Sequence, residues 1–378
     1  METLNINFVI PHAEKTGGTR VIFTLADQLS KRGHRVNIIA YHYTKWFTFS
    51  TNGTVRLIDI SRTIGGKIRL IPYYLNLFNQ RNLIFRQASL GINVAAYEAM
   101  VNQIPNADIN ISTWCMMSLP VLLKADGSIP VWHMQHLETI FFKNNPKARI
   151  FIEIIIRSRI NKIVNSTWLE GEVKKITKDK TWKFLPAINH EVFNANNLVK
   201  REKEKFKIVT LGKDGWKNGS FVIEAVRKLW KEYRYKRKVE LHVYGTDLNW
   251  IRNEEFIFKH TNIDDFLLAE LYKVSDCTVT ASDFESFPLP PLEAMACGSA
   301  VITTRFGTED FAVDMKNAII IKARDVNSIF DALNKLMTNE ELKEKLIMGG
   351  LETVKLFTWK KQVELYESIL LNLKSSQI

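Results

Sequence analysis

The residue types best suited to chemistry lie in the segment 282–298, whose sequence is SDFESFPLPPLEAMACG. Two carboxylates, Glu285 and Glu293, stand eight positions apart in it. Pro290 and Pro291 predict the start of a helix, because proline is tolerated at the first helical positions, and Glu293 is then expected in the first turn. Backbone N–H groups at such a helix start suit a diphosphate. The residues expected to line the diphosphate are Ser286, Phe287, Pro288 and Leu289.

This spacing can place one acid beside a sugar and the other beside a ribose, with the phosphates between them. A carboxylate can accept hydrogen bonds from two ribose hydroxyls, which is the role expected of Glu293. We expect Glu285 to contact the sugar. The alternative is that both are solvated surface charges beside a proline-rich turn, since Glu is rarely buried without a partner.

Two glycine-containing loops follow predicted strands, one in each half of the chain. Gly17 and Gly18 follow the first strand, and because glycine has no Cβ the backbone there can approach a donor phosphate closely. Lys213 and Lys217 lie in the loop 212–219, where fixed cations would neutralise a diphosphate. The alternatives are an ordinary strand-to-helix turn and a solvated lysine loop.

Four polar residues cluster where a strand of the first half is predicted to end: His133, Gln135, His136 and Glu138. On a strand, His133 and Gln135 would face one side, and His136 and Glu138 the other. Ligands bind at the carboxyl ends of parallel strands. We therefore expect His133, His136 and Glu138 to contact a bound ligand. The alternative for a lone histidine is a hydrogen-bonded place in the core.

The elements that would position these residues form two similar α/β halves. The first begins with strand 5–10, helix 19–32 and strand 35–40, a βαβ start that predicts a parallel sheet. The pattern restarts after the polar stretch 186–205, with a strand at 207–211 and a helix at 221–233. We predict two doubly wound, Rossmann-like domains that face a central cleft. Their expected limits are 1–190 with a closing helix at 359–378, and 200–358.

The segment SDCTVTASDFESFPLPPLEAMACGSAVITT strongly resembles the strand–loop–helix–strand unit of retaining glycosyltransferase family 4, which has the GT-B fold. The likeness includes that family's E-x7-E signature. The family's diglycine loop and helix are similar to TGGTRVIFTLADQLSKRGHRV in this chain. Its phosphate-binding loop is similar to LGKDGWKNG, and its closing helix is similar to FTWKKQVELYESIL. The resemblance implies a nucleotide diphosphate sugar as donor, no cofactor and no metal requirement.

The resemblance also implies transfer with retention by front-face departure, in which the leaving phosphate oxygen takes the acceptor proton. Glu285 would then position the sugar and stabilise charge. Within the family, WHMQHLETIFF and IVNSTWLEGEV are similar to a rhamnosyltransferase-like branch, which has Asp where this chain has His136. Lys213 stands where an arginine is common, in a loop one residue shorter, and lysine cannot form the bidentate fork of arginine.

Charge is unevenly distributed along the 378 residues. Residues 1–195 contain 24 Lys and Arg against 13 Asp and Glu, whereas the remainder is nearly balanced. The segments 65–86 and 143–162 mix basic and apolar residues, as interfacial helices on anionic membranes do. We expect a cytoplasmic protein, peripheral on the inner face of the cell membrane, with a glycan or lipid-linked acceptor. The alternative for both segments is a core helix with a solvated basic face.

Other function classes fit the residues less well. A nucleic-acid binder would share the basic pI but lacks any recognised module, so no nucleic acid is expected. A GT-B-like epimerase or phosphorylase would not be expected to combine the diglycine loop with E-x7-E. An inactive partner of a glycosyltransferase complex stays open, because Lys213 and the shortened loop depart from the family. Cys115, Cys277 and Cys297 have no ligand or disulfide spacing and predict reduced thiols.

Overall fold

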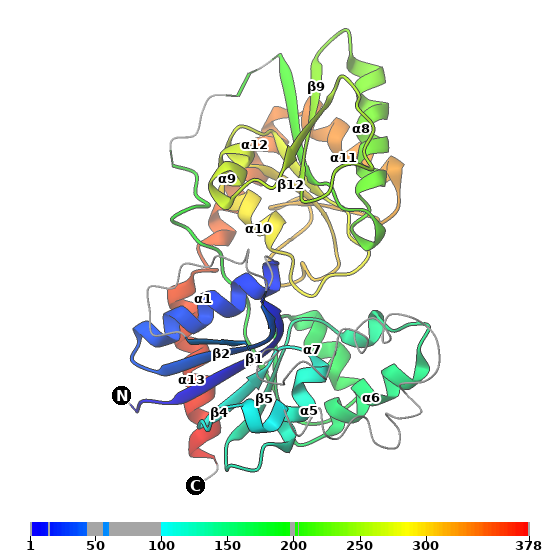
Figure 1. Ribbon diagram of the computed structural model, residues 1–378. Coiled ribbons are helices and arrows are strands. Elements are labelled where there is room, and N and C mark those ends of the chain that lie inside the picture. Colours follow the sequence, from blue (N-terminus) through cyan, green and yellow to red (C-terminus); the bar gives the residue numbers. More distant parts are fainter. Residues whose placement is uncertain are drawn as a thin grey trace. The chain divides into compact units, whose positions relative to one another are not determined.

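In the computed structural model the chain forms two compact units (Figure 1). The N-terminal unit comprises Met1–Leu185 and Gln362–Ile378, and the C-terminal unit comprises Pro186–Lys361. The structure describes residues 2–13, 16–43, 56–59, 100–196, 201–202 and 204–376.

The N-terminal unit is built on a seven-stranded sheet with the order β3-β2-β1-β4-β5-β6-β7. All its described strand pairs are parallel. Its strands are β1 (Asn5–Ala13), β2 (Arg35–Tyr43), β3 (Arg56–Asp59), β4 (Ile109–Ser112), β5 (Ile129–Met134), β6 (Asn161–Val164) and β7 (Thr181–Lys183). Its helices are α1 (Gly17–Lys31), α5 (Cys115–Leu123), η1 (Glu138–Ile140), α6 (Pro146–Arg157), α7 (Thr167–Lys174) and, mostly, α13 (Trp359–Ser375).

Helix α13 packs on the N-terminal unit although it comes last in the sequence. Glu367 on α13 is buried and accepts hydrogen bonds from Arg32 (2.8 Å) and lies 2.9 Å from a ring nitrogen of His34. Near the end of the helix, the Lys374 ammonium donates to Asp108 at 2.8 Å. Buried charges need such partners, so these contacts give α13 a defined place against the sheet.

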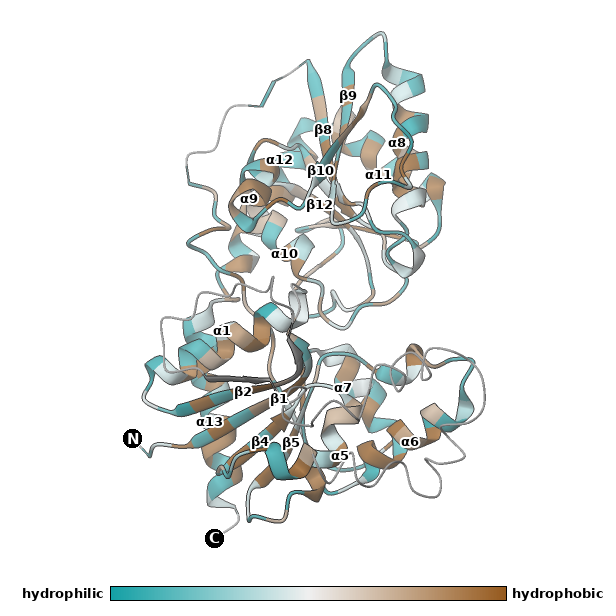
Figure 2. Cartoon of the chain, in the orientation of Figure 1, coloured by the Kyte–Doolittle hydropathy of each residue, from teal (hydrophilic) through white to brown (hydrophobic). Residues whose placement is uncertain are grey.

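The C-terminal unit is built on a six-stranded parallel sheet with the order β10-β9-β8-β11-β12-β13. Its strands are β8 (Lys205–Leu211), β9 (Lys238–Gly245), β10 (Ile257–Thr261), β11 (Cys277–Thr280), β12 (Ala300–Thr304) and β13 (Ile319–Ile321). Its helices are η2 (Gly215–Lys217), α8 (Gly219–Tyr233), α9 (Asp265–Lys273), α10 (Leu289–Ala296), α11 (Val326–Thr338) and α12 (Glu340–Val354). Figure 2 shows apolar and polar residues alternating along α8 and α11, as expected of helices with one buried face.

These sheets confirm the predicted fold class of two doubly wound, parallel α/β units. Two strands were not predicted. Strand β7 has only three residues, none of them buried, and β10 is a half-buried edge strand, so neither has a clear apolar run. Cys115, Cys277 and Cys297 are free thiols in the core. In the part of the chain that the structure describes, no helix is long and apolar enough to cross a membrane.

Candidate functional site

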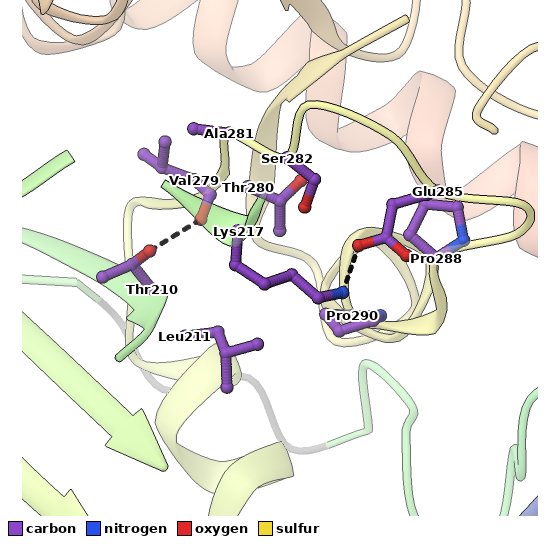
Figure 3. Close-up of a pocket in the computed structure, with 10 residues that line it drawn as sticks. All are labelled: Thr210, Leu211, Lys217, Val279, Thr280, Ala281, Ser282, Glu285, Pro288 and Pro290. Carbon is purple, nitrogen blue, oxygen red and sulfur yellow. Dashed lines mark hydrogen bonds and ion pairs between the residues drawn. The ribbon is translucent and has the colours of Figure 1, made fainter. Parts of the chain in front are cut away.

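A pocket in the C-terminal unit lies where β8 and β11 end (Figure 3). It is lined by Thr210, Leu211, Lys217, Val279, Thr280, Ala281, Ser282, Glu285, Pro288 and Pro290. The two strands are neighbours in the sheet, and the Thr210 hydroxyl ties them together by donating to the Val279 carbonyl at 3.0 Å. Carboxyl ends of adjacent parallel strands are where α/β sheets bind ligands.

Two opposite charges meet in this pocket. The Lys217 ammonium, at the end of η2, forms an ion pair with the Glu285 carboxylate, and Figure 3 shows the two side chains pointing toward each other. The Glu285 side chain is only 8% exposed and that of Lys217 is 21% exposed. Because solvent screens this pair only partly, the attraction between the two charges is greater than in a fully exposed pair.

Glu293 lies deeper than the sequence predicts. Helix α10 starts at Leu289, with Pro288 as its cap and prolines following, so Glu293 falls in the second turn rather than the first. This corrects the expected position. Glu293 is buried, at 3% exposure, and buried carboxylates in folded proteins have polar partners.

The phosphate-loop lysines have different surroundings. Lys217 lines the pocket, whereas Lys213 is exposed and its ammonium lies 4.8 Å from the centre of the Trp216 ring, a cation–π contact. The loop is tight: Gly219 donates to the Lys213 carbonyl at 3.1 Å, and a Cβ on Gly219 would approach that oxygen to 2.8 Å. Glycine is therefore required where α8 begins.

In the N-terminal unit, the diglycine pair opens α1 beside the end of β5. Thr16 caps this helix by accepting from the Thr19 N–H. The Gln135 side chain donates to the Gly18 carbonyl at 3.3 Å, and a Cβ on Gly18 would approach the Gln135 amide oxygen to 2.1 Å. The absence of a Cβ at Gly18 thus makes room for Gln135, while Gly17 is exposed at the helix start.

His133 is a core residue in this structure. It is fully buried, its Nδ1 lies 3.2 Å from the Tyr366 hydroxyl, and its ring meets Phe184 edge-on. Burial lowers the pKa of His133 to about 3, so the ring is neutral at ordinary pH. His133 therefore occupies a hydrogen-bonded place in the core, which was the alternative to ligand binding. Its imidazole ring is not accessible to a substrate.

His136 and Glu138 do not continue the strand, because β5 ends at Met134 and Glu138 opens η1. The expected strand alternation therefore does not apply to them. His136 is half-buried and packs edge-on against Phe141, with ring centres 5.5 Å apart. Glu138 is 1% exposed and accepts the Cys115 N–H at 2.8 Å, while its other oxygen has no hydrogen-bond partner among the described residues.

Burial raises the pKa of Glu138 to about 8, which predicts a measurable pH dependence of stability. Between the ordinary pKa of 4.5 and about 8 the folded chain keeps a proton that the unfolded chain has lost. The free energy of unfolding must then fall as pH rises through this window, by roughly 1.4 kcal/mol per pH unit at most. Glu138→Gln removes the ionisation, so its stability relative to the wild type should increase from pH 5 to pH 8.

Urea unfolding of both proteins at pH 5, 6.5 and 8 measures this difference. Other titrating groups affect both proteins alike, so only the pH-dependent part of the difference is informative. A difference that stays constant over the three pH values would contradict a buried, protonated Glu138.

Several residues that hold the site together were not predicted as site residues. Asn218, Asp283 and Arg324 form a polar cluster beside the Lys217–Glu285 pair. Gly307, with a φ of +70°, lets the segment after β12 pass close to the Glu285 backbone. An isolated glycine after a strand was the one sequence signal for Gly307; the three polar residues carry no distinctive pattern.

Comparisons with known proteins agree with this architecture. Residues 193–352 match the family model of glycosyl transferases group 1. An uncharacterised glycosyltransferase of Methanocaldococcus jannaschii is 21% identical over 336 residues, covering 87% of this chain and 89% of that protein.

Two solved structures have the same fold over nearly the whole chain. Sucrose-phosphate synthase of Thermosynechococcus elongatus has a TM-score of 0.77 at 16% identity, covering 98% of this chain and all of that one. HepE of Anabaena, crystallised with UDP-glucose, has a TM-score of 0.72 at 10% identity, covering 97% and 99%. Family 4 and its rhamnosyltransferase-like branch stay predictions. The fold and the family match together make this chain a glycosyltransferase enzyme with the GT-B fold.

Proposed function

We propose that the chain transfers a sugar, with retention of configuration, from a nucleotide diphosphate sugar to a cell-surface glycan, glycolipid or lipid-linked acceptor. The observation that carries this proposal is the partly buried Lys217–Glu285 pair, which lies beyond the ends of β8 and β11. One cation and one carboxylate in a small pocket match the two parts of such a donor, a diphosphate and a sugar. HepE, which shares the fold, binds a donor of this class.

In the proposed complex the donor diphosphate takes the place of Glu285 as the partner of Lys217. Glu285 is then released to accept hydrogen bonds from the sugar and to stabilise positive charge that develops at its anomeric carbon. Glu293 is assigned to the ribose hydroxyls, because a carboxylate can accept hydrogen bonds from two hydroxyls at once. Gly17 and Gly18 would admit the phosphates close to the α1 backbone.

The proposed reaction balances without a metal ion or an enzymic nucleophile. The bond between the anomeric carbon and the diphosphate oxygen breaks, and the acceptor oxygen bonds to that carbon on the same face. The acceptor proton passes to the departing phosphate oxygen. Lys217, with Lys213 nearby, and backbone N–H groups from Ser286, Phe287 and Leu289 would stabilise the diphosphate as it leaves.

A thermal-shift measurement with nucleoside diphosphates tests donor binding directly. At a concentration of about 100 Kd a ligand adds roughly 2.7 kcal/mol to stability, which is on the order of 5–10 °C for a unit of this size. Lys217→Met should lower the shift by about half or more, because losing a charge-assisted contact weakens binding about 10- to 100-fold. Lys335→Met, which removes an exposed lysine from α11, is the matched control and should keep it. The proposal fails if no nucleoside diphosphate shifts the wild type.

We further propose that the protein is cytoplasmic and binds the inner membrane surface through α6. Lys147, Ile150, Ile154 and Arg157 lie on one face of this helix and are all exposed, the two isoleucines at 58%. The opposite face is buried through Ala148, Ile152, Ile155 and Ile156. Apolar side chains between basic ones suit the boundary of an anionic leaflet.

The structure changes one part of the membrane hypothesis and does not describe another. Lys162 does not belong to the basic face: it is 1% exposed, and its ammonium donates to the carbonyls of Ser158 and Ile160 and to Asp179. Its hydrogen bonds instead connect β6 with the segment that follows the end of α6. The other candidate segment, 65–86, lies outside the described residues.

Co-sedimentation with vesicles tests the membrane proposal. The wild type should bind vesicles with anionic lipid at least tenfold more than neutral ones, since each basic residue near the surface contributes about 1 kcal/mol. Ile150→Asn combined with Ile154→Asn should lower binding about tenfold or more, because two apolar side chains no longer enter the interface. Leu365→Asn, at an exposed apolar position of α13, is the control. Equal, negligible binding to both vesicle types would refute the proposal.

A further inference from the structure

The two charges of the pocket are carried by separate segments that must be held in register. Lys217 belongs to residues 213–219, the Lys217 turn, which follows β8. Glu285 belongs to residues 281–287, the Glu285 loop, which follows β11. The two residues are 68 positions apart in sequence. Hydrogen bonds between the two segments therefore decide the distance between the charges.

Asp283 makes two of these bonds. Its carboxylate accepts the Asn218 side-chain N–H at 2.6 Å, and its backbone N–H donates to the Trp216 carbonyl at 2.8 Å. Asp283 is two positions from Glu285, and both of its partners in the turn are direct neighbours of Lys217. Each bond therefore acts on a residue next to, or close to, one of the two charges.

Asn218 is well suited to its place in this cluster. It is 2% exposed and has a left-handed backbone, with a φ of 57°, which asparagine tolerates better than most residues. Its side chain also donates to the Ala281 carbonyl at 2.8 Å. Asn218 thus links the Lys217 turn to the Glu285 loop at two points, Ala281 and Asp283.

A third segment completes the cluster. Arg324, in the connection between β13 and α11, donates through Nε to Asp283 at 3.0 Å and forms a second ion-pair contact with its other oxygen. A two-point arginine–carboxylate contact restricts the orientation of the carboxylate. Next to it, the rings of Trp216 and Phe284 stack with centres 5.9 Å apart, which adds an apolar contact between the same two segments.

We propose that Asp283 is a positioning residue, which holds Lys217 and Glu285 at the separation that the transfer reaction needs. The inference rests on the proposed function, because it takes the Lys217–Glu285 pair as the site of transfer. Asp283 itself is assigned no contact with the substrate. It acts through Asn218 and Arg324. Misplacing a catalytic group by about 1 Å can lower a rate about 100-fold, so a bond set of this kind has kinetic consequences.

Two readouts test the inference, and only one depends on turnover. Asp283→Ala should raise amide hydrogen exchange in both 213–219 and 281–287 about tenfold or more, with the rest of the C-terminal unit unchanged. It should also lower kcat with a nucleotide sugar by about 10- to 100-fold. Asp283→Asn, which keeps an oxygen for Asn218, should recover part of both effects.

The matched control is Glu254→Ala, which removes another carboxylate that forms a two-point contact with an arginine of the same unit, Arg227. It should lower the melting temperature and leave kcat unchanged. A double-mutant cycle separates positioning from mere stability: in the Asp283→Ala background, Glu285→Gln should cost much less than in the wild type. Fully additive losses would overturn the inference.

Failure of the proposed function gives a different result. In that case the wild type turns over no nucleotide sugar, while hydrogen exchange still reports on the cluster. Unchanged exchange in 213–219 of Asp283→Ala would overturn the positioning role whatever the activity. If Asp283→Ala does not fold, Arg324→Gln provides the same exchange measurement with one partner removed.

Discussion

Replacing Glu285 with glutamine is expected to lower turnover of a nucleotide sugar by about 10²- to 10³-fold, the usual effect of losing one preorganised electrostatic group. Glutamine keeps the size of the side chain and removes its charge. The positive charge that develops on the sugar then loses its nearest carboxylate. Initial rates over a range of donor concentrations give kcat and KM separately.

Affinity for the nucleoside diphosphate should respond in the opposite way. In the structure Lys217 is paired with Glu285, so a diphosphate must compete with this carboxylate for the ammonium. Glu285→Gln removes the competitor, and the diphosphate should bind at least as tightly as to the wild type. Titration calorimetry with the nucleoside diphosphate measures this, and a large loss of affinity would contradict the proposed exchange of partners.

The control for this prediction is another buried, ion-paired glutamate. Glu367 on α13 is 5% exposed and pairs with Arg32 and His34, in the N-terminal unit. Glu367→Gln should lower the melting temperature because Arg32 and the buried His34 lose the carboxylate charge that they contact. Its kcat should stay near that of the wild type. Equal losses of kcat in the two variants would mean that Glu285 matters only for folding.

Gly307→Ala is expected to have the second large effect, on both stability and activity. A Cβ at this position would lie 2.6 Å from the carbonyl oxygens of Glu285 and Ser286. Both obstacles are backbone atoms, so the Glu285 loop has to move. The φ of +70° adds about 1–2 kcal/mol of strain for any residue with a Cβ. We expect a lower melting temperature and a loss of kcat near 100-fold.

Gly127→Ala separates these two causes. Gly127 has a φ of +81°, but a Cβ there would meet nothing within 4 Å. Its alanine variant should show the backbone strain alone, as a loss of about 1–2 kcal/mol in stability with normal kcat. If both alanine variants lost stability equally and both kept full activity, the close approach of Gly307 to the Glu285 loop would have no functional meaning.

Most helices and strands could be predicted because their signals are local. Strand β8 (Lys205–Leu211) contains the predicted strand 207–211, and helix α8 (Gly219–Tyr233) starts two residues before the predicted helix 221–233 and ends at the same residue. Apolar residues repeat about every 3.6 positions on the buried face of a helix and every 2 positions on the buried face of a strand, so the spacing indicates the element. Strands β7 and β10 were not predicted because edge strands bury too little surface to need that spacing.

The site could be predicted only in outline. Glu285 and Lys217 were identified from their motifs, and the structure brings them together in one pocket. Glu293 was expected one turn too early, because the two prolines indicate a helix start without telling which residue caps it. His133 was expected to contact the acceptor or the donor sugar, but it is buried and lies beside Tyr366, from a helix 233 positions later.

The amino-acid order alone determined the α/β class, the two-unit organisation and the pair of charges to which we assign the transfer chemistry, since each is encoded in short segments. Only the tertiary structure decided which polar groups are buried and which residues hold the charges in place. Asp283 meets Asn218 across 65 positions and Arg324 across 41. Such contacts depend on which strands become neighbours in the sheet, and that outcome reflects the packing of the whole unit rather than any local pattern.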